Sequence, residues 1–134
     1  MNYGFWIIIA IIVVYVVLRF LMNKRFQNVP VNQLAEWVKA DNNRVVVDVR
    51  ETGEYQGGHF PGAINVPLTT LSSQLSKVPK DKDVALICRS GNRSMQAARI
   101  LKRSGYSKIW NVTRGMSGWN GQTEKGNKPG KLKA

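Results

Sequence analysis

One cysteine, Cys88, lies where its side chain could act as a nucleophile. It follows an apolar run, 84–87, that is typical of a buried strand, and the polar loop after it leads into a helical pattern. Backbone N–H groups of a tight turn, the positive end of a helix dipole and nearby arginine charges all favour thiolate over thiol. The sequence therefore predicts a lowered pKa for Cys88 and an anion-binding loop. The loop residues are Arg89, Ser90, Gly91, Asn92, Arg93 and Ser94.

Two plainer interpretations of these residues stay open. A lone cysteine is often only a small buried hydrophobe. Ser94 could be only a helix cap.

Four further residues are candidates for supporting roles. Asp48 and Arg50 end another apolar run, and we expect Asp48 to orient the loop or to pair with an arginine. His59 is the one histidine, but the sequence His-Phe-Pro-Gly is typical of a turn, which favours a structural role. Trp119 either walls the pocket or closes the core, and we favour the core. One Cys and one His exclude a zinc finger or a Cys-lined iron–sulfur site within one chain, so we expect no metal and no cofactor.

The elements that position these residues indicate a small α/β domain over residues 27–119. The strand runs are apolar on both faces, which predicts a mostly parallel sheet flanked by helices. The predicted strands are 45–47, 63–66, 84–87 and 108–112. The predicted helices are 32–39, 68–75 and 94–102. Residues 27–30 read as a linker because Pro30 does not continue a helix, and the Gly-, Lys- and Pro-rich residues 120–134 predict a basic flexible tail.

The N-terminal residues 1–26 are expected to form a transmembrane anchor with a basic flank. Residues 3–22 contain one charge, Arg19, and would span about 30 Å as a helix, which matches a hydrocarbon core. A cleaved signal fits less well because no basic residue precedes the run, and a buried core helix would need cover on every face. Arg19, Lys24 and Arg25 follow the span, which predicts a single-pass protein of the cell membrane with the N-terminus outside and the domain in the cytoplasm. A reducing compartment also agrees with the missing disulfides.

The net charge of +12 is spread along the chain rather than concentrated. It divides as +3 over residues 1–26, +6 over 27–119 and +3 over 120–134. No block is dense enough to indicate a nucleic-acid partner. The flexible cationic tail is expected to touch anionic lipid headgroups. The sequence does not indicate an oligomeric state.

Four motifs between residues 31 and 119 resemble, in order, those of a single rhodanese homology domain, a sulfurtransferase module. The motifs are Asp48-Val49-Arg50-Glu51, Gly58-His59-Phe60-Pro61-Gly62-Ala63-Ile64-Asn65-Val66-Pro67, Cys88-Arg89-Ser90-Gly91-Asn92-Arg93-Ser94 and Gly115-Met116-Ser117-Gly118-Trp119. The resemblance implies that Cys88 accepts a sulfane sulfur as a persulfide and passes it to a nucleophile. It also implies that His59 belongs to a structural signature.

The length of the cysteine loop separates the chemistries of this superfamily. Four residues lie between Cys88 and Arg93, whereas phosphatases and arsenate reductases of the same fold use a wider loop with five. Sulfur transfer is therefore favoured, from an anionic donor such as thiosulfate to a thiol, cyanide or protein acceptor. A cysteine-dependent arsenate reductase or phosphatase and a non-catalytic docking module are the alternatives.

Overall fold

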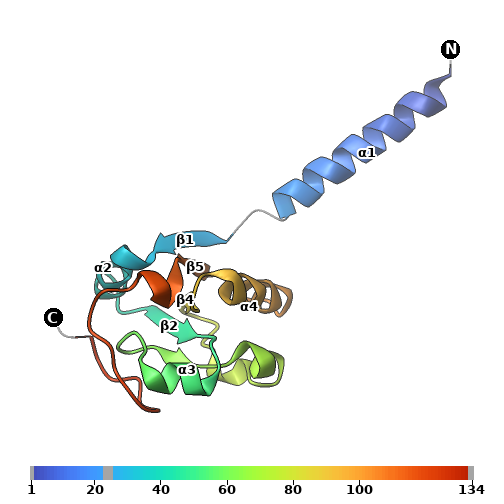
Figure 1. The fold of residues 1–134 in the computed structure, drawn as a ribbon. Helices are drawn as coiled ribbons and strands as arrows, with labels where there is room; N and C mark the ends of the chain where they lie inside the picture. Colours follow the sequence, from blue (N-terminus) through green and yellow to red (C-terminus); the bar gives the residue numbers. More distant parts are fainter. Residues whose placement is uncertain (1, 23–25, 133–134) are drawn as a thin grey trace.

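A computed structural model describes residues 2–22 and 26–132 of the chain (Figure 1). Helix α1 (Tyr3–Met22) stands apart from an α/β domain that contains all the strands. The strands are β1 (Gln27–Pro30), β2 (Arg44–Asp48), β3 (Ile64–Asn65), β4 (Asp83–Ile87) and β5 (Ile109–Thr113). The α-helices of the domain are α2 (Leu34–Lys39), α3 (Thr52–Gly57) and α4 (Asn92–Arg103). Short 3-10 helices are η1 (Val31–Gln33), η2 (Leu68–Ser73), η3 (Leu75–Lys77) and η4 (Gly115–Gly118).

The five strands form one sheet in the order β1-β5-β4-β2-β3, and every pairing is parallel. Central strand β4 pairs with β2 and with β5, so Leu86 lies between Val47 and Asn111. In a parallel sheet all strands begin at one edge and end at the other. We call these the amino edge and the carboxyl edge.

Two hydrophobic cores lie on the opposite faces of the sheet. Val47 and Leu86 point toward α4 and η2, whereas their neighbours Val46 and Ala85 point toward α2 and α3. Successive side chains of a strand alternate between faces, so a strand covered on both sides must be apolar throughout. The predicted parallel α/β fold is therefore confirmed.

The predicted linker at residues 27–30 is wrong, because these residues form the edge strand β1. They pair in parallel with β5 over Gln27–Trp110 to Pro30–Thr113, and Val29 is buried. Pro30 fits because it ends the strand, where its missing N–H costs little. Its partner strand β5 is about 80 residues away along the chain, so no local sequence pattern indicates that β1 pairs with it.

The predicted flexible tail also needs correction, because residues 120–132 lie along the domain. Glu124 and His59 exchange backbone hydrogen bonds of 2.9 Å in both directions. The Gly62 amide donates to the Pro129 carbonyl at 2.7 Å, and Leu132 packs against the core on the α2–α3 face. Composition indicated disorder, but these tertiary hydrogen bonds replace the missing local ones. Residues 133 and 134 of the predicted tail lie outside the described residues.

The predicted helices differ from the observed ones in type and bounds. The segment 68–75 forms the two 3-10 helices η2 and η3 rather than one α-helix. Helix α4 begins at Asn92, two residues before the predicted start, directly after Gly91. The cysteine loop is therefore shorter and tighter than the sequence alone indicated.

Helix α1 is exposed over Tyr3–Leu21, a stretch with a mean hydropathy of 2.6 of which none is buried. The buried-core-helix alternative is therefore wrong. By length and composition the helix is able to cross a membrane, although a signal sequence meets the same criteria. Lys24 and Arg25, on which the predicted orientation partly rests, lie outside the described residues.

Candidate active site

Cys88 lies at the carboxyl edge of the sheet, immediately after β4. Cys88 is only 1% exposed to solvent. The Gly91 amide donates a hydrogen bond to Sγ at 3.0 Å, and the Ser94 hydroxyl oxygen lies 3.5 Å from Sγ. Gly91 has φ of +106°, a conformation that glycine adopts without strain and that turns its N–H inward. The loop therefore closes around the sulfur.

The environment lowers the pKa of the Cys88 thiol from its ordinary value. Burial acts in the opposite direction and raises it, but hydrogen bonds from the Ser94 hydroxyl and from the backbone of Ser94, Gly91 and Ser90 outweigh burial. The predicted lowering is thus present, and the expected backbone N–H groups contribute to it together with the Ser94 hydroxyl. Hydrogen-bond donors of the loop are the main lowering cause, and the charge of Arg93 acts on Cys88 as a smaller coulombic contribution.

Ser94 is held in place by Asn111, a residue that the sequence analysis missed. Asn111 lies on β5, is buried, and places Oδ1 2.5 Å from the Ser94 hydroxyl oxygen, which also lies 2.9 Å from the Gly91 carbonyl. Ser94 follows the helix start by two residues, so it is not the N-cap. A polar residue inside the apolar run 109–112 was the available signal.

Arg93 forms an ion pair with Glu54 of α3, the second residue that the sequence analysis missed. Its Nη1 and Nη2 donate to the two carboxylate oxygens at 2.6 and 2.9 Å. The hydrogen bond from Arg93 holds the pKa of Glu54 at about 2, against the opposing effect of burial, and the pKa of Arg93 is raised in turn. The guanidinium is therefore already paired with a carboxylate.

Asp48 and Arg50 form a buried ion pair beside the loop. Arg50 Nη2 donates to Asp48 Oδ2 at 2.8 Å and to the Gly58 carbonyl at 2.7 Å. Asn65 donates to the carbonyls of both residues at 3.0 and 2.9 Å, which fixes the turn after β2. Asp48 thus pairs with an arginine, as expected, and the partner is the neighbouring Arg50.

Gly115 explains why a glycine opens the last sequence motif. The Met116 amide donates to the Cys88 carbonyl at 2.8 Å, and the Ser117 amide donates to the Arg89 carbonyl at 2.9 Å. A Cβ on Gly115 would collide with the Cys88 carbonyl, and its φ of +54° is left-handed. Helix η4 therefore packs directly against the backbone of the cysteine loop, and this close approach requires glycine at position 115.

His59 and Trp119 lie in the core on the α2–α3 face rather than against Cys88. The His59 ring stacks on Tyr55 with centroids 3.7 Å apart, and its Nε2 lies 3.0 Å from the Lys128 carbonyl. Trp119 packs edge-on against Phe60 with centroids 4.9 Å apart. Both residues have the structural surroundings that the sequence favoured.

Arg89 is the loop cation that stays available to a ligand. Its side chain is exposed and forms no ion pair with any described residue. It lines an open groove of about 390 Å³ together with Arg50, Gly58, Met116 and Ser117. Within the described ranges no group of three His, Cys, Asp or Glu side chains is placed to hold a metal ion. The site therefore combines a buried, activated sulfur with an exposed arginine at its rim.

Comparisons with known proteins agree with this site. The sequence model of the rhodanese-like domain matches residues 30–122. YrkF of Bacillus subtilis (strain 168) is 38% identical over 87 residues, which are 65% of this chain and 47% of YrkF, so the chain spans about half of that relative. A sulfurtransferase of Allochromatium vinosum is 37% identical over 75 residues, which are 56% of this chain and 70% of that protein.

Among solved structures, the fold is similar to that of a rhodanese-related protein from Thermoplasma volcanium. The TM-score is 0.66 at 29% sequence identity, and the match covers 74% of this chain and 98% of the other.

Proposed function

The chain belongs to the rhodanese-like domain family, and we propose that it carries sulfane sulfur as a persulfide on Cys88. The observation that carries the proposal is the position of Sγ, 3.0 Å from the Gly91 amide at the start of the tight loop before α4. Hydrogen bonds that lower the pKa of the thiol prepare it to react near neutral pH.

In the first step the Cys88 thiolate attacks the outer sulfur of a donor such as thiosulfate. A new S–S bond forms at Sγ, the S–S bond of thiosulfate breaks, and sulfite leaves with the bonding electron pair. The product is an anionic persulfide, and the N–H groups of the loop are placed to stabilise its charge. In the second step an acceptor thiolate or cyanide attacks the terminal sulfur and returns Cys88 as thiolate. No general base is needed when the thiol is already ionised.

The remaining residues bind and position rather than react. Exposed Arg89 attracts the anionic donor, the Gly91 amide donates to the charged sulfur, and Asn111 Oδ1 holds the Ser94 hydroxyl beside it. Because Cys88 is 1% exposed, the outer side of the loop at Arg89 and Ser90 must shift for the donor sulfur to touch Sγ. A site this tight suits transfer of one sulfur atom.

Phosphatase or arsenate reductase chemistry is less well supported by the same geometry. Such chemistry needs an arginine that binds a tetrahedral oxyanion, usually through two parallel hydrogen bonds. Here Arg93 already binds both oxygens of Glu54. We therefore place sulfur transfer ahead of it, and ahead of a docking module that would not need an activated thiol.

Helix α1 is proposed to anchor the enzyme in the cell membrane. Its 20 residues carry one charge, Arg19, near the end that leads into the domain. A cation at that end favours a cytoplasmic location for the domain and an outside location for the N-terminus. Flotation of the full chain with vesicles after alkaline carbonate washing tests this part by itself, and loss from the vesicle fraction would contradict it.

The chemical proposal is tested by intact-mass measurement after incubation with thiosulfate. We expect the wild type to gain one sulfur atom and the variant Cys88→Ala to gain none. Cyanide should then remove the added sulfur and yield thiocyanate. No adduct with thiosulfate or with a persulfide donor would overturn the proposal, and phosphate release from an aryl phosphate would favour the phosphatase alternative.

A further inference from the structure

The long acid-free stretch of the sequence is divided by the fold into two basic regions. No Asp or Glu occurs between Asp83 and Glu124, whereas seven Lys and Arg residues do. Arg89 and Arg93 lie at the carboxyl edge, in or next to the cysteine loop. Helix α4 then carries the chain back across the sheet, so Lys102, Arg103 and Lys108 lie at the amino edge, whereas Arg114 follows β5 at the carboxyl edge.

The cations of the amino edge surround one pocket of about 420 Å³. Lys102 lies over the Phe26 ring, with Nζ 5.8 Å from the centroid, and Lys80 lies over the Tyr106 ring at 5.3 Å. Lys102 and Lys108 line the pocket, and Arg103 follows Lys102 as the last residue of α4. We call Lys80, Lys102, Arg103 and Lys108 the basic collar. All four side chains are exposed.

The basic collar contains more positive than negative charge. Three acids lie at the same edge. Asp83 lines the same pocket, Asp81 lies in the turn between Lys80 and Lys82, and Asp41 lies in the turn before β2, where Asn43 joins it to Asp81. Arg103 and Lys108 form no ion pair with any residue in 2–22 or 26–132. The ion pairs Asp48–Arg50 and Glu54–Arg93 both lie at the other edge of the sheet.

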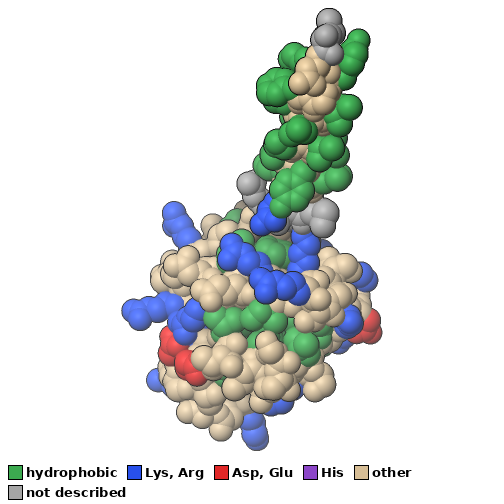
Figure 2. All heavy atoms as spheres, turned by 90° about the vertical axis from the view of Figure 1, so that its right-hand side faces the viewer, with side chains coloured by type: hydrophobic (Ala, Val, Ile, Leu, Met, Phe, Trp, Pro, Cys, Tyr) green, Lys and Arg blue, Asp and Glu red, His purple; other side chains and the backbone are tan. Residues whose placement is uncertain are grey.

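The basic collar is also the part of the domain to which α1 is attached. Strand β1 begins at Gln27, and Phe26 lies under Lys102 in the pocket. The four steps from Met22 to Phe26 reach at most about 14 Å, even when fully extended. Figure 2 shows Lys and Arg side chains gathered on the domain where α1 meets it. Any membrane that holds α1 therefore lies within reach of the collar.

We propose that the basic collar binds anionic phospholipid headgroups and seats the amino edge of the sheet on the membrane surface. The inference rests on the proposed anchoring by α1 but not on the sulfur chemistry. Multivalent lysine and arginine contacts near an anionic leaflet are favourable and fall off within a Debye length. The charge of the collar and its attachment to an apolar helix together favour a lipid surface over a soluble anion.

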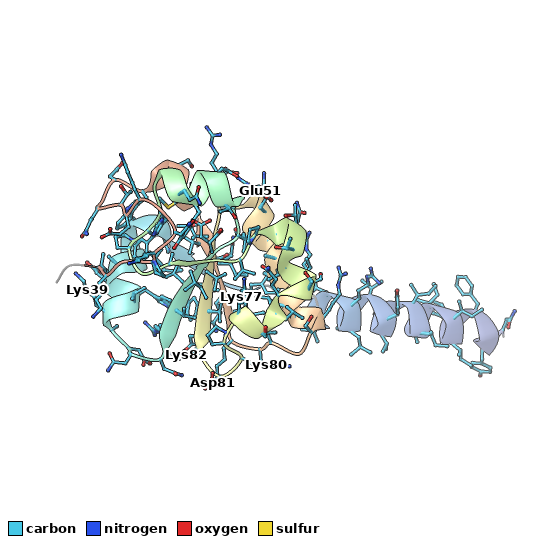
Figure 3. The ribbon with its side chains drawn as sticks, turned by 90° about the horizontal axis from the view of Figure 1, so that it is seen from below. Lys39, Glu51, Lys77, Lys80, Asp81 and Lys82 are labelled. Carbon is cyan, nitrogen blue, oxygen red and sulfur yellow. The ribbon has the colours of Figure 1, made fainter. Side chains whose placement is uncertain are left out.

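This seating would direct the cysteine loop away from the bilayer. The strands place Cys88 at the edge opposite the collar, and β4 alone separates the two edges by about 16 Å. In Figure 3 Glu51, which follows β2, lies at one end of the strands, while Asp81 and Lys82 lie at the other. Sulfur acceptors would then approach from the aqueous phase.

The test is lysine footprinting of the full chain in vesicles. The chain is reconstituted in pure phosphatidylcholine or in phosphatidylcholine with phosphatidylglycerol, acylated with a membrane-impermeant reagent and digested. We expect Lys80, Lys102 and Lys108 to be labelled several-fold less in the anionic vesicles, and 0.5 M salt to remove this protection, since about 0.5 M salt shortens the Debye length to a few ångströms. Lys125, on the tail beside α3, is the internal control and should label equally in both.

Matched variants make the result specific to the collar. In Lys102→Gln/Arg103→Gln/Lys108→Gln the protection of Lys80 should be lost, whereas in Lys125→Gln/Lys128→Gln it should be retained. Persulfide formation on Cys88 should be unchanged in both, since neither set touches the loop. Equal labelling of the collar in the two vesicle types would overturn the inference even if flotation confirms the anchor. Protection by added RNA without vesicles would also overturn it and would identify a nucleic-acid surface instead.

Discussion

Two arginine–carboxylate pairs flank the cysteine loop, and they differ mainly in burial. In the Asp48–Arg50 pair the side chains are 0% and 9% exposed, and the arginine also binds the Gly58 carbonyl. In the Glu54–Arg93 pair they are 34% and 30% exposed. The first pair joins neighbouring residues after β2, whereas the second joins α3 to α4 across the mouth of the site.

The difference assigns the two pairs to different tasks. Breaking a buried ion pair is costly, because the charge that remains is not solvated. Asp48–Arg50 therefore fixes the turn after β2, next to the cysteine loop. A half-exposed pair contributes little stability, because water screens it. Glu54 instead limits what Arg93 can do, since it neutralises the arginine closest to the start of α4. One arginine–carboxylate pair, Asp48–Arg50, thus stabilises the fold, whereas the other, Glu54–Arg93, sets the charge at the site.

The largest expected effect comes from breaking the buried pair. Asp48→Asn leaves the Arg50 guanidinium buried without its carboxylate, and we expect a loss of about 3–5 kcal/mol in the free energy of unfolding. Urea unfolding of the full chain in detergent micelles measures it. The matched control is the double replacement Asp48→Leu/Arg50→Met, which removes both charges and should cost less. A single variant as stable as the wild type would contradict the assignment.

A smaller effect is expected on the reactivity of Cys88, and it should differ between variants of Ser94 and of Arg93. Ser94→Ala removes a hydrogen bond to the sulfur, so the pKa of Cys88 should rise and alkylation of the lone cysteine at neutral pH should slow severalfold. Arg93→Gln should move the pH profile less than Ser94→Ala does, because Arg93 acts on the sulfur through charge alone whereas Ser94 is hydrogen-bonded to it. Iodoacetamide rates between about pH 5 and 10, a span that brackets ordinary thiol ionisation, measure both. A larger shift with Arg93→Gln would show that charge activates the thiol.

Releasing Arg93 should change donor binding more than stability. Glu54→Gln frees a cation at the mouth of the site, and we expect a lower KM for thiosulfate with little change in kcat. The free energy of unfolding should fall by less than about 1 kcal/mol, the range of a solvent-screened pair. Glu51→Gln, an acid at the same edge outside this ion pair, is the control. An unchanged or higher KM for Glu54→Gln would contradict the screening role.

The smallest effect is the pH dependence of the exposed pair. The pKa of Glu54 is lowered to about 2 from 4.5, so its contribution to stability is complete above pH 4.5 and is lost as the pH falls toward 2. Wild type should therefore lose slightly more stability than Glu54→Gln over that interval. Thermal unfolding of both chains at a series of pH values measures the difference. Parallel curves would show that the pair contributes nothing.

Much of the fold was predictable because its signals are local. The strands at 45–47, 84–87 and 108–112 are apolar on both faces, and Gly91 and Gly105 lie just outside the helix between the last two. Apart from the type and bounds of the helices, the errors occurred where pairing is distant in sequence. β1 needs β5, and the tail needs His59 and Gly62, and no local pattern encodes either contact.

The site was predictable in position but not in its electrostatics. The motif around Cys88 locates the proposed nucleophile, because a strand followed by a tight turn and a helix is recognisable along the chain. The partners that set its reactivity, Asn111 on β5 and Glu54 on α3, come from other elements. Only their approach in space shows that Ser94 is oriented and that Arg93 is neutralised.

The sequence by itself determined the parallel α/β fold, the position of the proposed nucleophile Cys88 and an apolar helix long enough to span a membrane, since each depends on the order and spacing of neighbouring residues. The tertiary structure alone decided which groups lower the pKa of Cys88, which arginine remains available and which cations surround the attachment of α1. Hydrogen bonds and ion pairs act over a few ångströms, and residues brought that close by the sheet are far apart along the chain.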